Sequence, residues 1–343
     1  MRTMEYVIKQ LEEIVNLPSP TGYTKRATKY IIEEVNRLGF LVEQNQKGGI
    51  VITVKGNEDE VIGLAAHLDT LGAMVRSISK DGMLNIVPIG GFMMESIEGA
   101  YCTVHTRDGK DYTGTILTKH PSVHTYDDAR TMERKAKNME VRLDELVTNS
   151  KEVEELGICA GDFISFSPNF VYTKSGFIKS RHLDDKASVA VLLGLLKEIK
   201  EGTVCPTKTL KILISNYEEV GHGASYLPED ITELLAIDMG ALGDDLTGDE
   251  TKVSICALDS SGPYDYDMTS NLILLAKQNN IDYAVDIFPH YGSDASAALR
   301  GGNNIKAALI GQGVHASHGM ERTHEKGMEN TLKLICAYVQ DIK

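Results

Sequence analysis

The sequence contains no tryptophan, and its five cysteines form no Cys-x-x-Cys pair. An odd number of scattered cysteines argues against both a disulfide framework and a zinc-ribbon site. No apolar run approaches the roughly 20 consecutive residues that span a membrane. The N-terminus shows neither an apolar signal core nor a small-residue cleavage site. We therefore expect a cytoplasmic protein.

Basic residues are scarce relative to acidic ones. Lysine and arginine together number 35 against 49 aspartates and glutamates, which gives a formal net charge of −14. This charge disfavours nucleic acid and anionic membranes as partners. Aromatic residues make up only 6%, but a hydrophobic fraction of 42% is ample for a core. A chain of 343 residues is long for one compact domain, so we expect two.

The pattern of apolar residues changes twice along the chain. Near both ends, amphipathic helical repeats alternate with apolar runs, which is typical of an α/β sheet. In the middle, short β-prone runs alternate with turn signals such as Asp81-Gly82 and Asp108-Gly109. We predict a mixed-sheet α/β domain formed by residues 1–72 plus 175–343, with a small β-barrel domain inserted at residues 73–174.

Acidic residues and a histidine follow three apolar runs. These runs, at residues 61–66, 209–216 and 233–237, predict buried strands. The side chains directly after them are His67 and Asp69, Glu218 and Glu219, and Asp238. Most paired acids are solvated surface groups, but ligands of open α/β sheets sit at the carboxyl ends of strands. Three strand ends of this kind predict a single site.

Two further segments carry polar groups of the same types. Asp184 and Asp185 precede a helix that is apolar on nearly all sides, and helix capping is the simplest role for them. Three histidines, His315, His318 and His324, follow a fourth predicted strand at residues 306–310. A lone histidine there would most simply be a surface group, whereas three within ten residues favour a metal ligand.

Histidines and carboxylates without thiolates suit Zn²⁺, Co²⁺ or Mn²⁺. These ligands are more than one ion needs, so they suggest a pair of ions. A carboxylate such as Asp69 would orient His67 through its other ring nitrogen. A carboxylate that binds no metal, such as Glu218, would take a proton from the attacking water and pass it to the leaving amine.

Several short motifs, in this order, resemble the M42 family of dinuclear metallo-aminopeptidases. They are His67-x-Asp69, Leu183 to Lys186, Glu218 to Gly221, Ile237 to Gly240, Gly292 to Ala295, and Ser317-His318. The resemblance extends over nearly the whole chain, including the position of the insert.

The resemblance implies a role for each matched residue. His67 and Asp238 would bind one metal ion, and Glu219 and His318 the other. Asp184 would bridge the two ions. Glu218 would be the general acid and base, and Asp69 would support His67. The implied activity is removal of N-terminal residues from peptides by a metal-bridged water, with two divalent ions, zinc first among them. The implied assembly is a homo-oligomer, from a dimer to a dodecamer.

The chain departs from the commoner pattern at two places. Thr70 stands where a glutamate is usual, and the run from Val314 to His318 replaces an Arg-Tyr-x-His-Ser sequence. We expect His318 to be the last ligand because it directly follows Ser317, with His315 and His324 as the alternatives. The departures leave the side-chain preference and the dodecamer open.

Other functions compete with this interpretation. A metal-dependent deacylase or carboxypeptidase acting on acylated amino acids would use the same chemistry at the carbonyl group. A glycosidase would use paired acids without metal, but it would leave the histidines unexplained. A purely structural zinc site would be closed and rich in cysteine.

Two expectations concern the insert. All proposed ligands lie outside residues 73–174, so we expect this segment not to be needed for metal binding. Its histidines, His105, His120 and His124, are expected to be surface groups rather than ligands.

Overall fold

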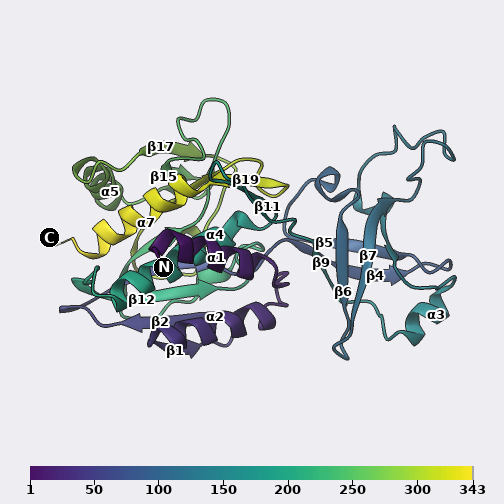
Figure 1. Ribbon diagram of the computed structural model, residues 1–343, viewed down its shortest axis with the longest axis horizontal. Coiled ribbons are helices and arrows are strands. Elements are labelled where there is room, and N and C mark those ends of the chain that lie inside the picture. Colours follow the sequence, from purple (N-terminus) through teal and green to yellow (C-terminus); the bar gives the residue numbers. More distant parts are fainter. Residues whose placement is uncertain (342–343) are drawn as a thin grey trace.

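The computed structural model describes residues 1–341 of the chain. Figure 1 shows two lobes side by side, a larger α/β lobe that carries both marked chain ends and a smaller lobe of strands. The helices are α1 (Thr3–Val15), α2 (Lys25–Leu38), α3 (Ser150–Glu155), α4 (Leu183–Lys200), α5 (Tyr266–Gln278), α6 (Asp294–Arg300) and α7 (Glu325–Val339), with 3-10 turns η1 (Met94–Ile97), η2 (Ala136–Asn138) and η3 (Gly223–Ser225). None of the described helices is both long and apolar enough to cross a bilayer.

The α/β lobe is built on a 10-stranded mixed sheet. Its strands are β1 (Leu41–Gln44), β2 (Ile50–Val54), β3 (Glu58–His67), β12 (Lys208–Ser215), β13 (Ile231–Ile237), β14 (Gly240–Ala241), β15 (Val253–Asp259), β16 (Gly262–Pro263), β17 (Tyr283–Phe288) and β18 (Lys306–Val314). The order is β1-β2-β12-β3-β13-β18-β15-β16, with β14 beside β18 and β17 beside β15. The central strands β12, β3, β13 and β18 run parallel, and antiparallel neighbours flank them. The predicted fold class is confirmed.

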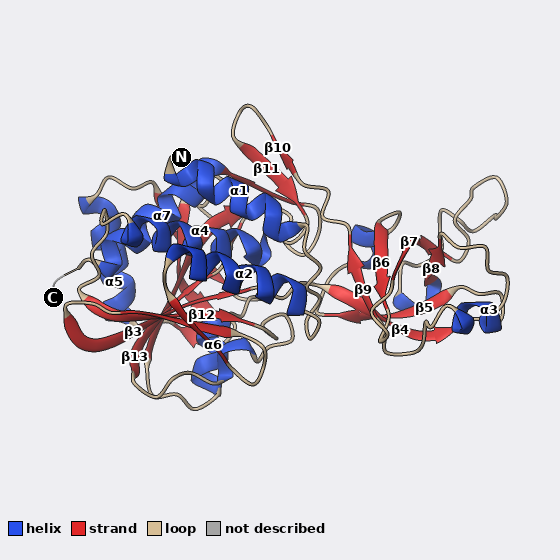
Figure 2. Cartoon of the chain, turned by 60° about the horizontal axis from the view of Figure 1, so that its bottom comes forward, coloured by secondary structure: helices blue, strands red, loops and turns tan. Residues whose placement is uncertain are grey.

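Both faces of the sheet are buried, which explains why its strands read as continuous apolar runs. In β3, Ile62 and Leu64 belong to a core on one face, and Ala65 belongs to the core on the other. Helices α1, α2, α4, α5 and α7 cover the first face, while α6 covers the second (Figure 2). The 3-10 turn η3 also packs on the second face. Helix α4 packs against α1, α2, α7 and the sheet, so it is apolar all round.

The second lobe is a closed barrel. Its strands are β4 (Gly72–Ile78), β5 (Leu84–Ile89), β6 (Tyr101–His105), β7 (Asp111–Thr118), β8 (Met139–Leu143) and β9 (Phe163–Phe166), in the order β4-β5-β8-β7-β6-β9. The barrel has its own hydrophobic core, to which alternate residues of its strands contribute, for example Ile116 of β7 and Ile164 of β9. The chain returns through β10 (Val171–Tyr172) and β11 (Phe177–Ser180), which form a small sheet with β19 (Glu321–His324).

Side-chain contacts fasten the barrel to the α/β lobe. Arg26 of α2 forms a bidentate ion pair with Asp111 of the barrel, with N–O distances of 2.6 and 3.1 Å. Tyr23 stacks on His105 with ring centroids 4.7 Å apart. The expectation that His105 is a surface group is wrong, because it is 2% exposed and its ring contacts Asp111 and Ser165. His120 and His124 do lie at the surface.

Strand β18 approaches the neighbouring backbone too closely for any side chain at Gly311. A Cβ atom there would lie 1.7 Å from the main-chain oxygen of Asp238. We predict that Gly311→Ala forces β18 away from β13 and lowers stability by about 1–3 kcal/mol, the usual cost of overpacking. Gly243→Ala is the control, because nothing lies within 4 Å of that added atom. Thermal and urea denaturation of both variants would measure the difference, and equal stability would contradict the prediction.

Candidate active site

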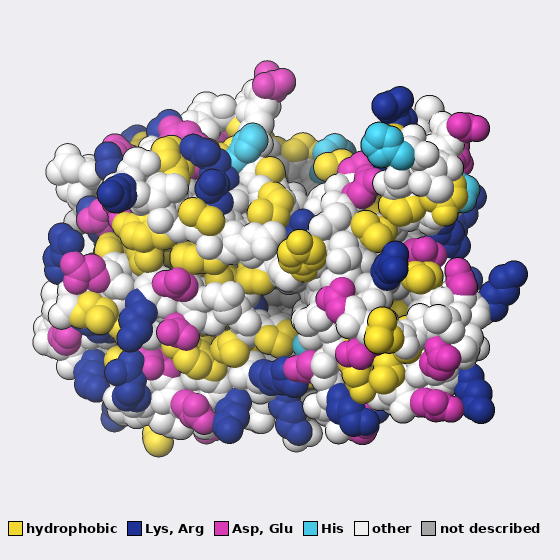
Figure 3. Space-filling view, turned by 45° about the vertical axis from the view of Figure 1, so that its right-hand side comes forward, with side chains coloured by type: hydrophobic (Ala, Val, Ile, Leu, Met, Phe, Trp, Pro, Cys, Tyr) yellow, Lys and Arg dark blue, Asp and Glu magenta, His cyan; other side chains and the backbone are white. Residues whose placement is uncertain are grey.

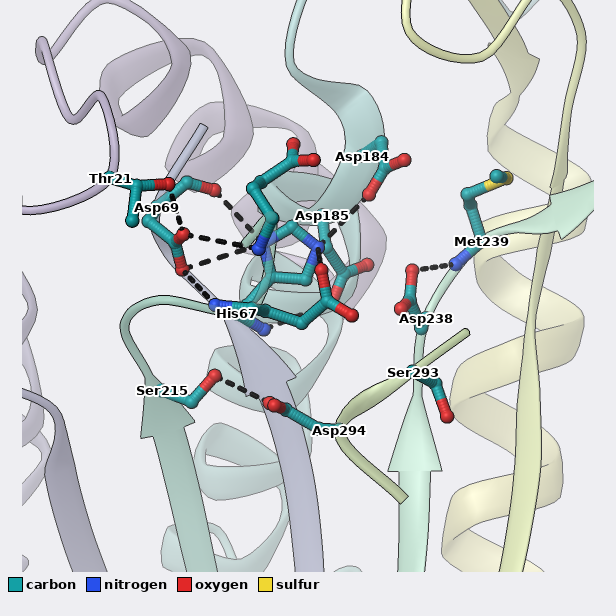
Figure 4. A network of polar contacts seen from close by, with 12 residues as sticks. Thr21, His67, Asp69, Asp184, Asp185, Ser215, Asp238, Met239, Ser293 and Asp294 are labelled. Carbon is teal, nitrogen blue, oxygen red and sulfur yellow. Dashed lines mark hydrogen bonds and ion pairs between the residues drawn. The ribbon is translucent and has the colours of Figure 1, made fainter. Parts of the chain in front are cut away.

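The polar residues predicted from the strand ends lie close together. Strands β12, β3 and β13 are parallel neighbours, so their carboxyl ends share one edge of the sheet. His67 is the last residue of β3, Asp238 directly follows β13, and Glu218 and Glu219 lie in the turn after β12. Asp184 approaches from the start of α4 (Figure 4).

Five of these side chains form two overlapping groups with the spacing that a metal ion requires. One group is His67, Asp184 and Asp238, and the other is Asp184, Glu219 and His318. Within each group, the ligand atoms lie within 4.8 Å of one another. Asp184 belongs to both, because its Oδ1 lies 3.0 Å from His67 Nε2 and its Oδ2 lies 3.2 Å from His318 Nε2.

Burial makes negative charge expensive at this edge of the sheet. Burial raises the pKa of Glu218 and Glu219 well above the usual range, and it raises the pKa of Asp238 to about 7. Burial acts in the same direction on Asp184, but hydrogen bonds from His318 and His67 outweigh it and lower the pKa of Asp184.

The residues fit divalent cations. Two buried carboxylate oxygens, Oε1 of Glu219 and Oδ1 of Asp185, have no hydrogen-bond partner among the described residues. Glu219 belongs to a candidate group and lies beside His318, so its free oxygen is a suitable ligand for a metal ion. Positive charge there would keep the surrounding acids ionised.

Glu218 lies beside these groups without belonging to either. Its Oε2 is 3.6 Å from His67 Nε2, and its side chain retains 13% exposure. The carboxylate therefore faces the site and still has access to a bound molecule.

Asp69 contacts His67 in a different way from the one expected. Nδ1 of His67 lies 2.9 Å from the main-chain oxygen of Asp69, whereas the nearest carboxylate oxygen is 3.9 Å away. The carboxylate instead accepts hydrogen bonds from Thr21 Oγ1 and from the main-chain N–H groups of Glu218 and Glu219. Asp69 therefore contacts His67 through its backbone and the Glu218–Glu219 turn through its side chain.

Of the three histidines near the C-terminus, only His318 reaches the site. His324 caps helix α7 through Nδ1, and its Nε2 contacts the main-chain oxygen of Ser175. His315 is exposed and pairs through its backbone with Arg322. His318 Nε2 lies 3.5 Å from Glu219 Oε2.

Known proteins are similar to this chain in sequence and in fold. The family model described as M42 glutamyl aminopeptidase matches residues 48–334. The chain belongs to the M42 family. This M42 aminopeptidase is 49% identical to the YhfE protein of Bacillus subtilis (strain 168) over 342 residues, which cover 99% of both chains.

Solved structures resemble the M42 aminopeptidase over their whole length. A TET aminopeptidase from the marine sediment archaeon Thaumarchaeota archaeon SCGC AB-539-E09 superposes with a TM-score of 0.89 at 21% identity, covering 98% of this chain and 97% of that one. The TET1 peptidase of Pyrococcus horikoshii gives a TM-score of 0.86 at 23% identity, covering 98% and 100%. At these identities the likeness shows the fold alone.

The structure adds residues to the site of the M42 enzyme that the sequence did not indicate. Glu321 is 2% exposed, and its carboxylate accepts hydrogen bonds from the main-chain N–H groups of Asp184, at 3.1 Å, and His318, at 3.0 Å. No motif identified it, because its burial depends on pairing between β19 and β11.

The insert also contacts the site. The main-chain oxygen of Gly91, in the loop after β5, accepts a hydrogen bond from His318 Nδ1 at 2.5 Å. This loop touches a candidate ligand, although every candidate ligand itself lies outside the insert. That metal binding does not need the insert stays a prediction.

A cavity of about 230 Å³ opens beside the candidate ligands of the M42 enzyme. Besides the acids, it is lined by His290, Tyr291 and Arg300. The surface is also hollowed between the two lobes, which Figure 3 shows. A small side chain could therefore lie next to the two groups of ligands.

We predict that the purified enzyme carries up to two divalent ions per chain. Elemental analysis of the protein would give the number, and o-phenanthroline or EDTA should abolish hydrolysis and lower the melting temperature, because the buried acids lose their counter-charge. Re-addition of Zn²⁺, Co²⁺ or Mn²⁺ should restore both. Full activity in a sample shown to be free of metal would contradict this prediction.

Proposed function

We propose that this M42 aminopeptidase uses two divalent metal ions to remove N-terminal residues from peptides. His67 and Asp238 would hold one ion, Glu219 and His318 would hold the other, and Asp184 would be the ligand common to both. The observation that carries the proposal is the placement of Asp184, whose two oxygens face the two histidines. Zinc is the expected metal, because its common ligands are histidine nitrogens and carboxylate oxygens, with Co²⁺ and Mn²⁺ as alternatives.

When bound, the two cations would lower the pKa of the attacking water toward neutrality and polarise the carbonyl group of the substrate. The protein residues then have to hold that arrangement and move protons. The buried position of Asp184 between His67 and His318 supports its role as the shared ligand.

Glu218 is proposed as the general acid and base. Its carboxylate faces His67 without joining either group of ligands, so it can accept a proton from the water and pass it to the leaving amine. Burial already raises its pKa, which matches a group that must both take and release a proton. Asp69 fixes the turn that carries Glu218, through the hydrogen bond from the Glu218 main-chain N–H.

A metal-dependent deacylase or carboxypeptidase remains the alternative, because the chemistry at the carbonyl carbon is the same. Membership of the M42 aminopeptidase family favours a free N-terminus in the substrate. Hydrolysis rates on matched aminoacyl-anilides and their N-acylated forms would separate the two. Faster cleavage of the acylated series would reject aminopeptidase activity.

The two adjacent glutamates should respond differently to the same change. Glu218→Gln removes the proton acceptor and keeps every proposed ligand, so kcat should fall by about 10²–10⁴ while metal content stays at the wild-type value. Glu219→Gln should instead lose one ion. Steady-state kinetics and elemental analysis of both variants check this, and an exchange of the two phenotypes would reverse the assignment within the pair.

We also propose that the protein is cytoplasmic. The five cysteines of the chain are free, which suits a reducing compartment.

We propose further that the barrel lobe serves association and substrate access. Large apolar side chains lie exposed on the barrel lobe, among them Met93, Tyr101 and Val123. The TET1 peptidase of Pyrococcus horikoshii can assemble into a tetrahedron or an octahedral shell.

A homo-oligomer is therefore expected for this chain, with at least two subunits and up to twelve. Stable homomeric interfaces often bury more than about 2,000 Å², so the assembly should persist at micromolar concentration. Multi-angle light scattering or native mass spectrometry gives the mass directly. A monomer under these conditions would reject association and leave substrate access as the role of the barrel.

A further inference from the structure

The loop after β5 extends from the barrel to the candidate metal ligands. Besides the contact of Gly91 with His318, Gly90 packs against the α/β lobe. A Cβ atom on Gly90 would lie 2.5 Å from Leu71 Cδ2 and 3.4 Å from the main-chain oxygen of Glu219. Gly91 therefore touches His318, and any side chain at position 90 would meet Glu219; both residues share one group of candidate ligands.

The contact with Gly91 determines how the His318 ring can bind. A main-chain oxygen can only accept a hydrogen bond, so it selects the tautomer with the proton on Nδ1. In the neutral ring that a metal ion requires, the lone pair of Nε2 then points toward Asp184 and Glu219, whose oxygens lie 3.2 and 3.5 Å away. Partners of this kind, on the far side of the ring from the metal, orient a histidine and raise its basicity.

Few other contacts constrain His318. Its side chain is 38% exposed, and its backbone lies outside strands and helices with a φ of 60°. The carboxylate of Glu321 holds its main-chain N–H, but within the described residues Gly91 is the hydrogen-bond partner of Nδ1. The ring orientation therefore depends on the barrel loop.

Arg181 makes a second connection between the barrel and the site. Its guanidinium donates a hydrogen bond to the main-chain oxygen of Ser96, in η1 of the barrel, at 2.6 Å. Arg181 is 6% exposed and lies three residues before Asp184. The barrel segment from Gly90 to Ser96 thus contacts two of the three chain segments that meet at the Asp184–Glu219–His318 group, those that carry Asp184 and His318.

We infer that the barrel lobe completes the Asp184–Glu219–His318 metal group, so the position of the barrel controls the affinity for that ion. This inference rests on the proposed two-metal function. The two groups share Asp184, but they differ in their histidines: among the described residues, the hydrogen-bond partner of His67 Nδ1 is the main-chain oxygen of Asp69, in the α/β lobe. The chain should therefore hold one ion regardless of the barrel and a second only when the barrel is in place.

The test displaces the loop and measures each ion separately. Gly90→Val places a side chain against Leu71 and Glu219, so the carbonyl group of Gly91 moves away from His318. Metal-free protein would be titrated with Zn²⁺ against a chromophoric chelator. We expect one site at wild-type affinity and one weakened by about 10–100-fold, the usual effect of losing such a partner. Glu219→Gln gives the reference for loss of the same ion.

Gly99→Val is the matched control. Gly99 has the same φ as Gly90, +79°, and lies in the same lobe, but nothing lies within 4 Å of its added Cβ. It therefore carries the same backbone strain without the displacement, and both ions should bind as in the wild type. Arg181→Met releases the Ser96 contact from the other side and should weaken the ion held with His318 more than the ion held with His67, which keeps the test valid if Gly90→Val does not fold.

Three outcomes would overturn the inference. Both Gly90→Val and Arg181→Met could bind two ions with wild-type affinity, both ions could weaken equally, or Gly99→Val could show the same loss as Gly90→Val. A wild-type protein that binds fewer than two ions would reject the proposed function instead. Circular dichroism would check that each variant is folded. The visible spectrum of the Co²⁺-loaded protein should lose the component that Glu219→Gln removes.

Discussion

Buried negative charge is the constraint on which this site depends. Asp184, Asp238, Glu218 and Glu219 converge at one edge of the sheet, where water is largely excluded. Isolated carboxylates in such surroundings take up protons rather than stay charged, and only nearby positive charge reverses this. Two histidines contribute some of that charge. The arrangement therefore suits cations. The surrounding hydrogen bonds keep the acids apart and fix their orientation.

Those hydrogen bonds come mainly from the backbone. Asp69 and Glu321 each accept hydrogen bonds from the main-chain N–H groups of two residues of the site. Asp69 fixes the Glu218–Glu219 turn, whereas Glu321 joins the segments that carry Asp184 and His318. Loops held in this way can carry functional groups with little movement, because their geometry is set by charged acceptors as well as by packing. The rigidity needed at the strand ends is thus supplied by acids that bind no metal in our proposal.

The sequence predicted the parts of this arrangement that follow from the strands. A central parallel strand needs an unbroken apolar run, and the residue that ends the run must lie at the edge of the sheet. That reasoning located His67, Glu218, Glu219 and Asp238 without any structure. The mixed sheet and inserted barrel were predicted in the same way, from two kinds of periodicity. The roles of these side chains stay predictions.

Other features left no mark in the sequence. The carbonyl groups of Gly91 and Asp69 act through the backbone, which every residue possesses. Glu321 is buried only because β19 pairs with β11, more than a hundred residues away. His105 is buried because two lobes meet around it, and a short β-prone segment does not reveal its neighbours. A local sequence pattern therefore does not predict contacts between distant segments or contacts made by main-chain atoms.

The strand order also determines when the protein can fold during synthesis. Strand β12 lies between β2 and β3, although the ribosome makes β2 and β3 first and the whole barrel before β12. Until residue 215 has emerged, β3 has neither of its sheet neighbours and its apolar faces are uncovered. The barrel strands, by contrast, all find their partners within residues 72–166. The nascent chain would thus carry a folded barrel beside an incomplete sheet. During that period, chaperone binding would protect the chain from aggregation.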